Sequence, residues 1–345
     1  MTANEKIKVG ISVGDLNGIG VEVILKTFQD KRMMDFCTPV VFASNKVISY
    51  HKKALGLNVA THQAQNINSI VDNKLNILQS WTEEVNIDLG KASKEVGAFA
   101  LKSLEAASQA LKNKEVDILL TAPINKDNIF NEDFQFPGHT EYLEENFEGN
   151  SLMLLINDTL RLGLITGHIP VSKVSETITE DLIRMKVDLL HTSLKQDFEI
   201  EKPKIAILGL NPHCGDKGVI GTEDDELIRP TIAAIQEEGK MVFGPYAADG
   251  FFGSRAYEEF DGVLAMYHDQ GLAPFKALSF GNGVNFTAGL DVVRTSPDHG
   301  TGYGIAGRGE ANPDSFKEAL FSGLQIFKSR KNYLNLRSNA MKVKA

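Results

Sequence analysis

The sequence predicts an α/β fold built on a largely parallel central sheet. Short apolar runs of strand length alternate with longer segments of helical periodicity along the 345 residues, which is the pattern of βαβ units. Most of the apolar runs end in polar or Gly/Pro-rich loops, as strands do at the ligand-binding edge of such a sheet. With 42% hydrophobic residues, the chain can bury a globular core, and its length suits roughly two or three domains.

The first predicted elements are a strand over 7–14, which ends at Gly14, and a helix that begins after Gly20. In 93–114 apolar residues recur at spacings of three and four, which predicts a helix with one apolar face, and a buried strand follows over 116–124. Further strands are predicted at 152–157, 161–166, 204–210, 241–246 and 262–268.

Proline residues mark helix boundaries in the second half of the chain. Pro230 should kink or shorten the helix that begins near Thr222. Asn312 and Pro313 form a cap and first-turn pair, which predicts a final helix that ends at about Leu334.

The charge balance and the cysteine content exclude several classes of protein. The 36 Lys and Arg against 45 Asp and Glu leave a net charge of −9 and no basic run, so nucleic acid is not an expected partner. Cys37 and Cys214 are far apart and form neither a redox pair nor a disulfide framework, which predicts reduced cytosolic thiols. Because the sequence shows no leader pattern and no apolar run of bilayer length, we expect a cytoplasmic protein without a membrane partner.

Four of the eight histidines follow strand-like runs and lie in Gly/Pro-rich loops: His168, His213, His268 and His299. A single loop histidine is more often structural than functional, but strand ends of an α/β sheet meet around one crevice. Three neutral imidazoles with an open coordination position suit Zn²⁺ or a similar divalent transition metal. Their spacing matches no metal motif, so the prediction rests on their placement.

Two glycine-rich segments are candidates for a nucleotide-binding loop. The loop GDLNGIG (14–20) joins a strand to a helix and offers backbone amides that can cradle an anion, although it is not a Walker sequence. Gly302, Gly304 and Gly307 form a literal GxGxxG, but no strand precedes it and no ribose-binding acid follows, so we discount it as a dinucleotide fingerprint. The region 281–310 breaks the α/β pattern, which suggests a crossing between domains or a segment that wraps a ligand.

Isolated basic residues indicate an anion site. Lys126, Lys276 and Arg294 lie in loops rich in Gly, Asn and Thr, and a surface charge is the simplest interpretation of each one alone. His139 with Thr140, and also Asn285, would add neutral donors. Such a mixture suits a phosphate or a carboxylate.

Seven motifs together resemble one family. They are GDLNGIG, TAPINK (121–126), FPGHTEYL (136–143), TGHIPVSKV (166–174), GLNPHCGDKGVIGTED (209–224), YHDQGLAPFK (267–276) and RTSPDHGTGYGIAGRGEANPDSF (294–316). In this order they resemble the 4-hydroxythreonine-4-phosphate dehydrogenases of pyridoxal phosphate biosynthesis, and the likeness covers nearly the whole chain. The first and last motifs also look like segments of isocitrate and isopropylmalate dehydrogenases, which implies their two-subdomain α/β fold and not a Rossmann fold.

The resemblance implies a discontinuous outer lobe on the cofactor side, residues 1–135 with 290–345, and an inner lobe, residues 136–289, that holds the metal and the dimer contact. The active site would lie in the crevice between the lobes. It would be shared across the interface of a homodimer.

The resemblance also assigns roles to individual residues. It implies metal ligation by His168, His213 and His268, with Zn²⁺ expected and Mg²⁺ or Co²⁺ as alternatives. It implies contacts to a small phosphorylated hydroxy amino acid from His139, Thr140, Lys276, Asn285 and Arg294. The segment from His299 onward looks like the one that holds the adenosine end of NAD or NADP, with His299, Gly300, Thr301 and Asn312 as cofactor residues. Leu16 and Asn17 stand where many members have Pro-Ala, a departure that falls near the nicotinamide.

The implied reaction is oxidation of the secondary hydroxyl of 4-phosphooxy-L-threonine to 2-amino-3-oxo-4-phosphooxybutanoate, followed by decarboxylation to 3-amino-2-oxopropyl phosphate. The general base is left open among Asp269, Asp249, Lys126 and Lys217. Relatives acting on erythronate or threonate 4-phosphate are the nearest alternative. A three-histidine zinc hydrolase that uses no nucleotide is a more distant one, and a metal-binding scaffold leaves the clustered polar groups without a purpose.

Overall fold

The structure is a computed structural model that describes residues 6–129, 136, 138–279 and 281–338. Its internal contacts divide the chain into two units, residues 1–147 with 292–324 and residues 148–291 with 325–345. The lobe boundary expected between residues 135 and 136 borders a segment outside the described residues and stays a prediction.

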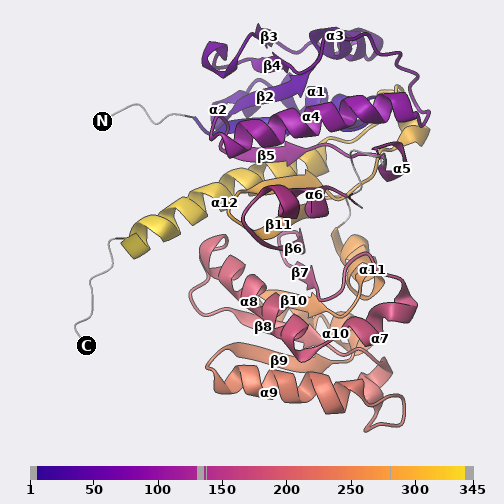
Figure 1. Ribbon diagram of the computed structural model, residues 1–345, viewed down its shortest axis with the longest axis vertical. Helices are drawn as coiled ribbons and strands as arrows, with labels where there is room; N and C mark the ends of the chain where they lie inside the picture. Colours follow the sequence, from indigo (N-terminus) through magenta and orange to yellow (C-terminus); the bar gives the residue numbers. More distant parts are fainter. Residues whose placement is uncertain (1–5, 130–135, 137, 280, 339–345) are drawn as a thin grey trace. The chain divides into compact units, whose positions relative to one another are not determined.

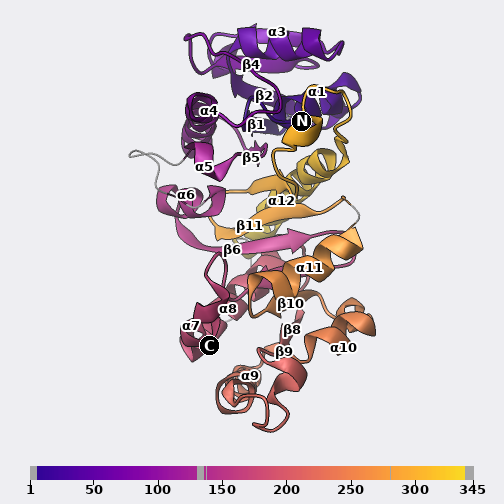
Figure 2. The ribbon, with the colours of Figure 1, turned by 90° about the vertical axis from the view of Figure 1, so that its right-hand side faces the viewer.

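The first unit is a sheet of parallel strands covered by helices on both faces. The strand order is β3-β4-β2-β1-β5-β12, and every pairing within it is parallel. Helix α4 lies on one face and α1 on the other (Figures 1 and 2). The strands are β1 (Lys8–Ser12), β2 (Thr38–Ala43), β3 (Thr61–Ala64), β4 (Leu75–Gln79), β5 (Ile118–Thr121) and β12 (Arg294–Pro297). The helices are α1 (Gly20–Gln29), α2 (Met33–Phe36), α3 (Asn45–Ala54), α4 (Lys94–Lys112), α5 (Lys126–Ile129), α6 (His139–Asn146) and the first half of α12 (Asp314–Ser338).

The local sequence explains the main elements of this unit. The hydroxyl of Ser93 accepts the Val96 amide at 3.5 Å and so caps α4. The apolar face predicted for 93–114 is buried against β1, β2 and β5, where Leu104 and Ala107 are at most 1% exposed. The predicted strands at 7–14 and 116–124 and both helices are therefore confirmed, with the strands a few residues shorter than expected.

The second unit has a mixed sheet that is also mostly parallel. The order is β11-β6-β7-β10-β8-β9, and only β6 is antiparallel to its described neighbours. Helix α8 packs on one face, and α11 lies on the other (Figure 2). The strands are β6 (Gly149–Ile156), β7 (Arg161–Leu164), β8 (Lys204–Leu208), β9 (Met241–Tyr246), β10 (Gly262–Ala265) and β11 (Val284–Leu290). The helices are α7 (Val174–Thr177), α8 (Glu180–Gln196), α9 (Arg229–Glu237), α10 (Ala248–Gly253) and α11 (His268–Ser279).

Small residues bring helices close to this second sheet. A side chain at Gly271 of α11 would lie 2.6 Å from Leu162 and 2.9 Å from Ala265, so the helix can approach the strands only with glycine there. The apolar core beneath α10 and α11 includes Leu164, Val263 and Phe275. The predicted α/β class with a largely parallel sheet is confirmed.

The helix boundaries follow the prolines. Helix α9 starts at Arg229 with Pro230 in its first turn, and the preceding residues 224–228 form a separate π-helical turn, so Pro230 shortens the helix as predicted. Asn312 accepts the Asp314 amide at 2.9 Å through its side chain, which confirms the cap of α12. That helix ends at Ser338 and not at about Leu334.

Two further findings concern the class of protein. Cys37 and Cys214 are both buried and carry free thiols. None of the helices in the described part of the chain has both the length and the apolarity needed to cross a bilayer.

Burial of His51 makes stability depend on pH. The residue is 1% exposed on α3, and desolvation lowers its pKa to about 4, although a hydrogen bond to the Leu16 backbone acts to raise it. Between pH 6.5 and pH 4 the His51 imidazole is protonated in the unfolded chain but not in the folded protein. The free energy of unfolding therefore falls as the pH falls toward 4.

The loss due to His51 should be about 2 kcal/mol between pH 7.5 and pH 5. Urea unfolding of the wild type and of His51→Leu at these pH values measures it, because the variant should lose that much less stability over the same interval. Equal pH dependence in the two proteins would contradict the assignment.

Candidate active site

The strand order of the first unit creates a switch point between β1 and β5. The chain proceeds from β1 to β2 on one side and returns to β5 on the other, which is where ligands bind in open α/β sheets. The segments that leave the two strands meet there, since the Asp15 amide donates to the Pro123 carbonyl at 2.9 Å. Gly14 has a φ of +67°, and a Cβ on it would lie 2.2 Å from that carbonyl, so only glycine fits this turn.

Four of the seven amides of GDLNGIG donate hydrogen bonds within the protein. Besides Asp15, the amide of Asn17 donates to the Asp15 carboxylate, that of Gly18 to the Asp15 carbonyl, and that of Ile19 to the Thr301 carbonyl. The sequence-based prediction that this loop cradles an anion on free amides therefore loses these four donors, and for the other amides of the loop it stays a prediction. These N–H groups hold loops together.

Arg294 is the buried cation of the first unit. It is 2% exposed at the start of β12, and its Nε and Nη2 donate to the Thr121 hydroxyl at 3.1 and 2.6 Å. Burial lowers the pKa of Arg294 to about 9, and the Glu141 carboxylate offsets that effect only in part. The guanidinium is thus charged at neutral pH, although burial opposes its charge.

His139 lies beside this cation. Burial lowers the pKa of its imidazole well below the ordinary value, and the positive charges of Arg294 and Lys126 lower it further, so the ring is neutral at pH 7. Although the residue as a whole is only half-buried, its Nε2 is enclosed and finds no hydrogen-bond partner among the described residues. The structure therefore brings Lys126, His139 and Arg294 together, with Thr140 next along α6.

The three predicted metal ligands follow three adjacent parallel strands of the second unit. His168 follows β7, His213 follows β8, and His268 opens α11 directly after β10, which lies between the other two. The rings of His168 and His268 are 5.3 Å apart between centroids. Nδ1 of His268 contacts the Asp269 carboxylate at 2.7 Å, which leaves Nε2 as the free ligating atom.

His213 lies in a turn of unusual backbone geometry. His213, Cys214, Asp216 and Lys217 all have φ between 45° and 55°, the left-handed region that costs free energy for residues with a Cβ. The buried Asp224 carboxylate holds the start of this turn by accepting two backbone amides at 2.8 and 2.9 Å. Within the described residues no three His, Cys, Asp or Glu side chains are arranged as a metal site, so the structure assembles two of the three predicted ligands.

The other predicted residues of the second unit are more dispersed. Lys276 is exposed on α11, whereas Asn285 on β11 has an enclosed Oδ1 without a partner in the described structure. Asp249 is exposed on α10, and its charge acts to raise the pKa of Cys214, which places it near the His213 turn. Lys217 is exposed on the same turn.

The predicted cofactor segment is attached to the switch point. The Thr301 carbonyl accepts the Ile19 amide at 2.9 Å, and the hydroxyl of Tyr303 donates to the buried Asp15 carboxylate at 2.7 Å. That carboxylate and the burial of the phenol raise the pKa of Tyr303, so the phenol stays protonated. Nε2 of His299 is enclosed and lacks a partner among the described residues.

Sequence reasoning missed Asp15, Thr121 and Tyr303. Asp15 and Tyr303 are 288 positions apart, and no periodicity or spacing connects them. The usable signal was the position of Asp15 and Thr121, one after a strand and the other at the last residue of a strand.

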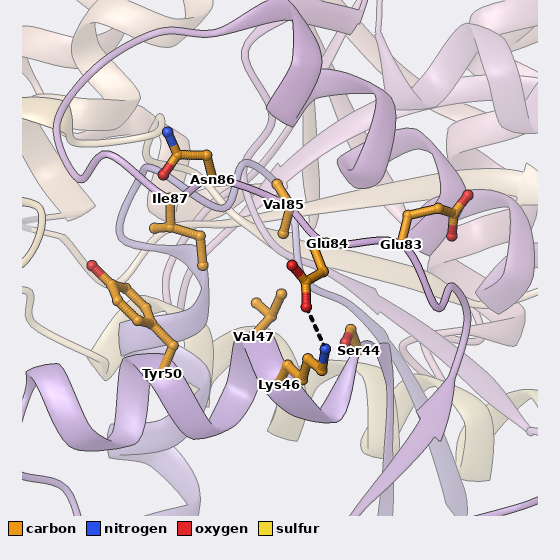
Figure 3. Close-up of a pocket in the computed structure, with 9 residues that line it drawn as sticks. All are labelled: Ser44, Lys46, Val47, Tyr50, Glu83, Glu84, Val85, Asn86 and Ile87. Carbon is orange, nitrogen blue, oxygen red and sulfur yellow. Dashed lines mark hydrogen bonds and ion pairs between the residues drawn. The ribbon is translucent and has the colours of Figure 1, made fainter.

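A pocket of about 330 Å³ lies in the first unit at the N-terminus of α3 (Figure 3). Lys46 and Glu84 line this pocket and form an ion pair at 2.7 Å, which is drawn as a dashed line in Figure 3. None of the residues predicted as site residues lines this pocket. We assign it no ligand.

Comparison with known proteins gives a consistent result. Residues 35–322 match the family described as pyridoxal phosphate biosynthetic protein PdxA. The chain is 48% identical over 339 residues to a 4-hydroxythreonine-4-phosphate dehydrogenase of Bacteroides thetaiotaomicron, covering 98% of this chain and 93% of the relative. It is 38% identical over 328 residues to the enzyme of that name from a Sulfurihydrogenibium species, covering 94% and 100%.

Solved structures agree with the sequence relatives. A 4-hydroxythreonine-4-phosphate dehydrogenase from Klebsiella pneumoniae superposes with a TM-score of 0.80 at 28% identity, covering 95% of this chain and 99% of the other. The one from Burkholderia phymatum has a TM-score of 0.75 at 31% identity, covering 94% and 99%.

Proposed function

The chain belongs to the family of pyridoxal phosphate biosynthetic proteins PdxA, and on that premise we propose that it oxidises 4-phosphooxy-L-threonine with NAD or NADP and a divalent metal. It is a dehydrogenase, like its curated relatives. In the proposed reaction a hydride leaves the carbon that bears the secondary hydroxyl, and the hydroxyl proton goes to a base. The resulting 3-oxo acid then loses CO₂ and takes up a proton at carbon, which gives 3-amino-2-oxopropyl phosphate.

The observation that carries the proposal is the buried cation of the first unit. Arg294 holds its charge in a site where burial disfavours it, and the enclosed Nε2 of the neutral His139 has no partner in the described structure. A phosphate dianion would offset the charge of Arg294 and would give the Nε2 of His139 a partner, because a guanidinium binds phosphate oxygens in a bidentate manner and an imidazole N–H can donate to a third oxygen. Lys126 and Thr140 extend this donor set.

The histidine pair of the second unit supports the metal. Neutral imidazoles are suitable ligands for Zn²⁺ and Co²⁺, and Asp269 holds His268 in the tautomer that exposes Nε2. His168 and His268 would hold the metal, with His213 as the third ligand. When bound, the metal would supply Lewis-acid polarisation of the substrate oxygen, and the nucleotide would supply the hydride acceptor.

The contacts of Asp269 reduce the number of candidates for the general base from four to three. Because the Asp269 carboxylate is bonded to His268, we propose that Asp269 orients a ligand and that Asp249, Lys126 or Lys217 moves the proton. His299, Gly300 and Thr301 would line the nucleotide site. Asn312, the fourth predicted cofactor residue, caps α12 through its side chain.

We further propose a homodimer that shares its metal site. Two of the three predicted ligands lie together within one chain, whereas no three-ligand group occurs among the described residues. A third ligand from a second copy would complete the coordination, which supports sharing of His213 between subunits.

Absorbance at 340 nm tests the proposed function. We expect reduction of NAD or NADP with 4-phosphooxy-L-threonine, loss of the signal in EDTA, and little turnover of erythronate 4-phosphate. Turnover of erythronate 4-phosphate alone would assign the protein to the alternative substrate. Absence of nucleotide binding by calorimetry would instead favour a hydrolase.

A further inference from the structure

Asn17 connects GDLNGIG to a second loop of the first unit, residues 88–91. Its side chain is 1% exposed, its Oδ1 accepts the Asp88 amide at 2.9 Å, and its Nδ2 donates to the Lys91 carbonyl at 2.8 Å. Its own carbonyl accepts the Gly90 amide at 2.8 Å. Asn17 therefore makes three hydrogen bonds to a loop more than 70 positions away in the sequence.

An amide side chain matches the two backbone partners that the loop 88–91 presents in this chain. The two partners are a backbone N–H and a backbone C=O, so the bridging group must accept and donate at once. Alanine can do neither, and aspartate can only accept. Loss of the bridge would leave the Asp88 amide and the Lys91 carbonyl, which belong to exposed residues, to water and so free the loop from Asn17.

The loop 88–91 in turn supports the predicted cofactor segment. A Cβ on Gly90 would lie 3.0 Å from the Tyr303 carbonyl, and a Cβ on Gly307 would lie 2.7 Å from the Leu89 side chain. Gly90 and Gly307 both have positive φ, so these close approaches depend on glycine. Displacement of 88–91 would therefore displace 303–307.

Asp15 completes the connection from the opposite side. Its Oδ1 accepts the Asn17 amide at 2.9 Å, while its Oδ2 accepts the Tyr303 hydroxyl at 2.7 Å and Asn128 Nδ2 at 3.2 Å. The buried polar cluster of Asp15, Asn17 and Tyr303 thus links the turn after β1 to both loops. These contacts form within the chain itself and need no ligand.

We propose that Asn17 is a positioning residue for the nicotinamide nucleotide: it holds loop 88–91, and that loop sets the position of residues 299–307 before the nucleotide binds. This inference rests on the proposed function in one respect, because it takes 299–307 as the nucleotide segment. A preorganised segment needs less ordering on binding, so its loosening should weaken nucleotide affinity more than substrate affinity.

Asn76 provides a matched control in the same unit. It is fully buried near the start of β4, and its side chain likewise bridges backbone groups, accepting the Val71 amide at 2.8 Å and donating to the Val71 carbonyl at 2.9 Å. It also donates to the Pro39 carbonyl at the start of β2. This contact lies at the amino ends of the strands, whereas the switch-point loops follow their carboxyl ends. Asn76→Ala should cost stability without any effect on the nucleotide.

The test compares Asn17→Ala with Asn76→Ala. For Asn17→Ala we expect the KM for the nucleotide to rise roughly tenfold with the KM for the phosphorylated substrate little changed, and amide exchange of 88–91 and 299–307 to accelerate. For Asn76→Ala we expect Tm to fall about as much as it does for Asn17→Ala. The nucleotide KM and the amide exchange of 88–91 and 299–307 should stay as in the wild type. If the two variants share the same nucleotide KM and the same exchange in 299–307, Asn17 is only structural and the inference is wrong.

A second variant and a second measurement distinguish failure of this inference from failure of the fold or of the proposed function. If Asn17→Ala does not fold, Leu89→Ala removes the contact to Gly307 without leaving a buried polar group, and it should raise the nucleotide KM in the same way. If the wild type turns over no substrate, the proposed function fails, but hydrogen exchange on the wild type and the variants still decides whether Asn17 orders 299–307. Unchanged exchange in that segment would refute the positioning role whatever the activity.

Discussion

Replacing Arg294 with Met should lower kcat/KM for the phosphorylated substrate by about 100- to 1000-fold. A buried, charge-assisted bidentate contact contributes about 3–4 kcal/mol to binding, and Met restores the length of the side chain but none of its charge. The free energy of unfolding should not fall by a comparable amount. Burial already lowers the pKa of Arg294 to about 9, so removal of the cation relieves a desolvation cost in the protein without ligand.

Arg161→Met is the matched control. Arg161 is half-buried, and burial lowers its pKa as it does for Arg294, but it lies at the start of β7 with its guanidinium 4.7 Å from the Phe198 ring centroid. This variant should lose stability and keep kcat/KM. A comparison with unphosphorylated 4-hydroxythreonine isolates the contribution of the phosphate group to kcat/KM. Arg294→Met should lower the ratio of kcat/KM for the phosphorylated substrate to kcat/KM for the unphosphorylated one. If that preference survives in Arg294→Met, the anion binds elsewhere.

Replacing His168 with Ala should remove the bound metal and lower kcat roughly a thousandfold. His268→Ala should do the same, because the two rings lie together at the ends of neighbouring strands. Metal content after dialysis and absorbance at 340 nm measure the two effects. His62→Ala is the control, since that ring contacts the Ser69 carbonyl at 3.0 Å in the first unit and belongs to neither donor set.

Mixing two inactive variants tests whether the site is shared. In a mixed dimer of His168→Ala and His213→Ala, one of the two sites receives intact His168 and His268 from one copy and intact His213 from the other. Mixing should therefore restore turnover and metal binding in part. No recovery, in dimers shown by mass to have exchanged subunits, would place all three ligands in one chain, and full activity of the EDTA-treated wild type would remove the metal from the proposal.

The sequence predicted the apolar elements well and the polar ones poorly. Strands such as β8 and β10 are continuous apolar runs, so burial alone specifies them. Strand β12 has the sequence RTSP, which is the composition of a loop, but Arg294 and Thr295 pair with Leu119 and Leu120 of β5. Its strand character depends on that partner, which no local pattern contains.

The same contrast holds in the candidate site. Placement at strand ends correctly brought His168 next to His268, because neighbouring parallel strands deliver their following residues to one edge. It could not foresee that the amides of Asp15, Asn17 and Ile19 donate to Pro123, to the Asp15 carboxylate and to Thr301. Nor could it foresee that Thr121 accepts two hydrogen bonds from Arg294.

The sequence by itself therefore determined the α/β class, the order of most strands and helices, and the family, and it supplied the histidines and bases that we propose for the chemistry. These follow from periodicity, composition and contiguous motifs, all of which are local. Only the tertiary structure decided which polar groups are buried together: the neutral His139 beside the charged Arg294, and Asn17 and Asp15 holding loops that are far apart in the chain. Burial and hydrogen bonding between distant segments arise when the strands assemble, and they set protonation states and loop positions that no local pattern encodes.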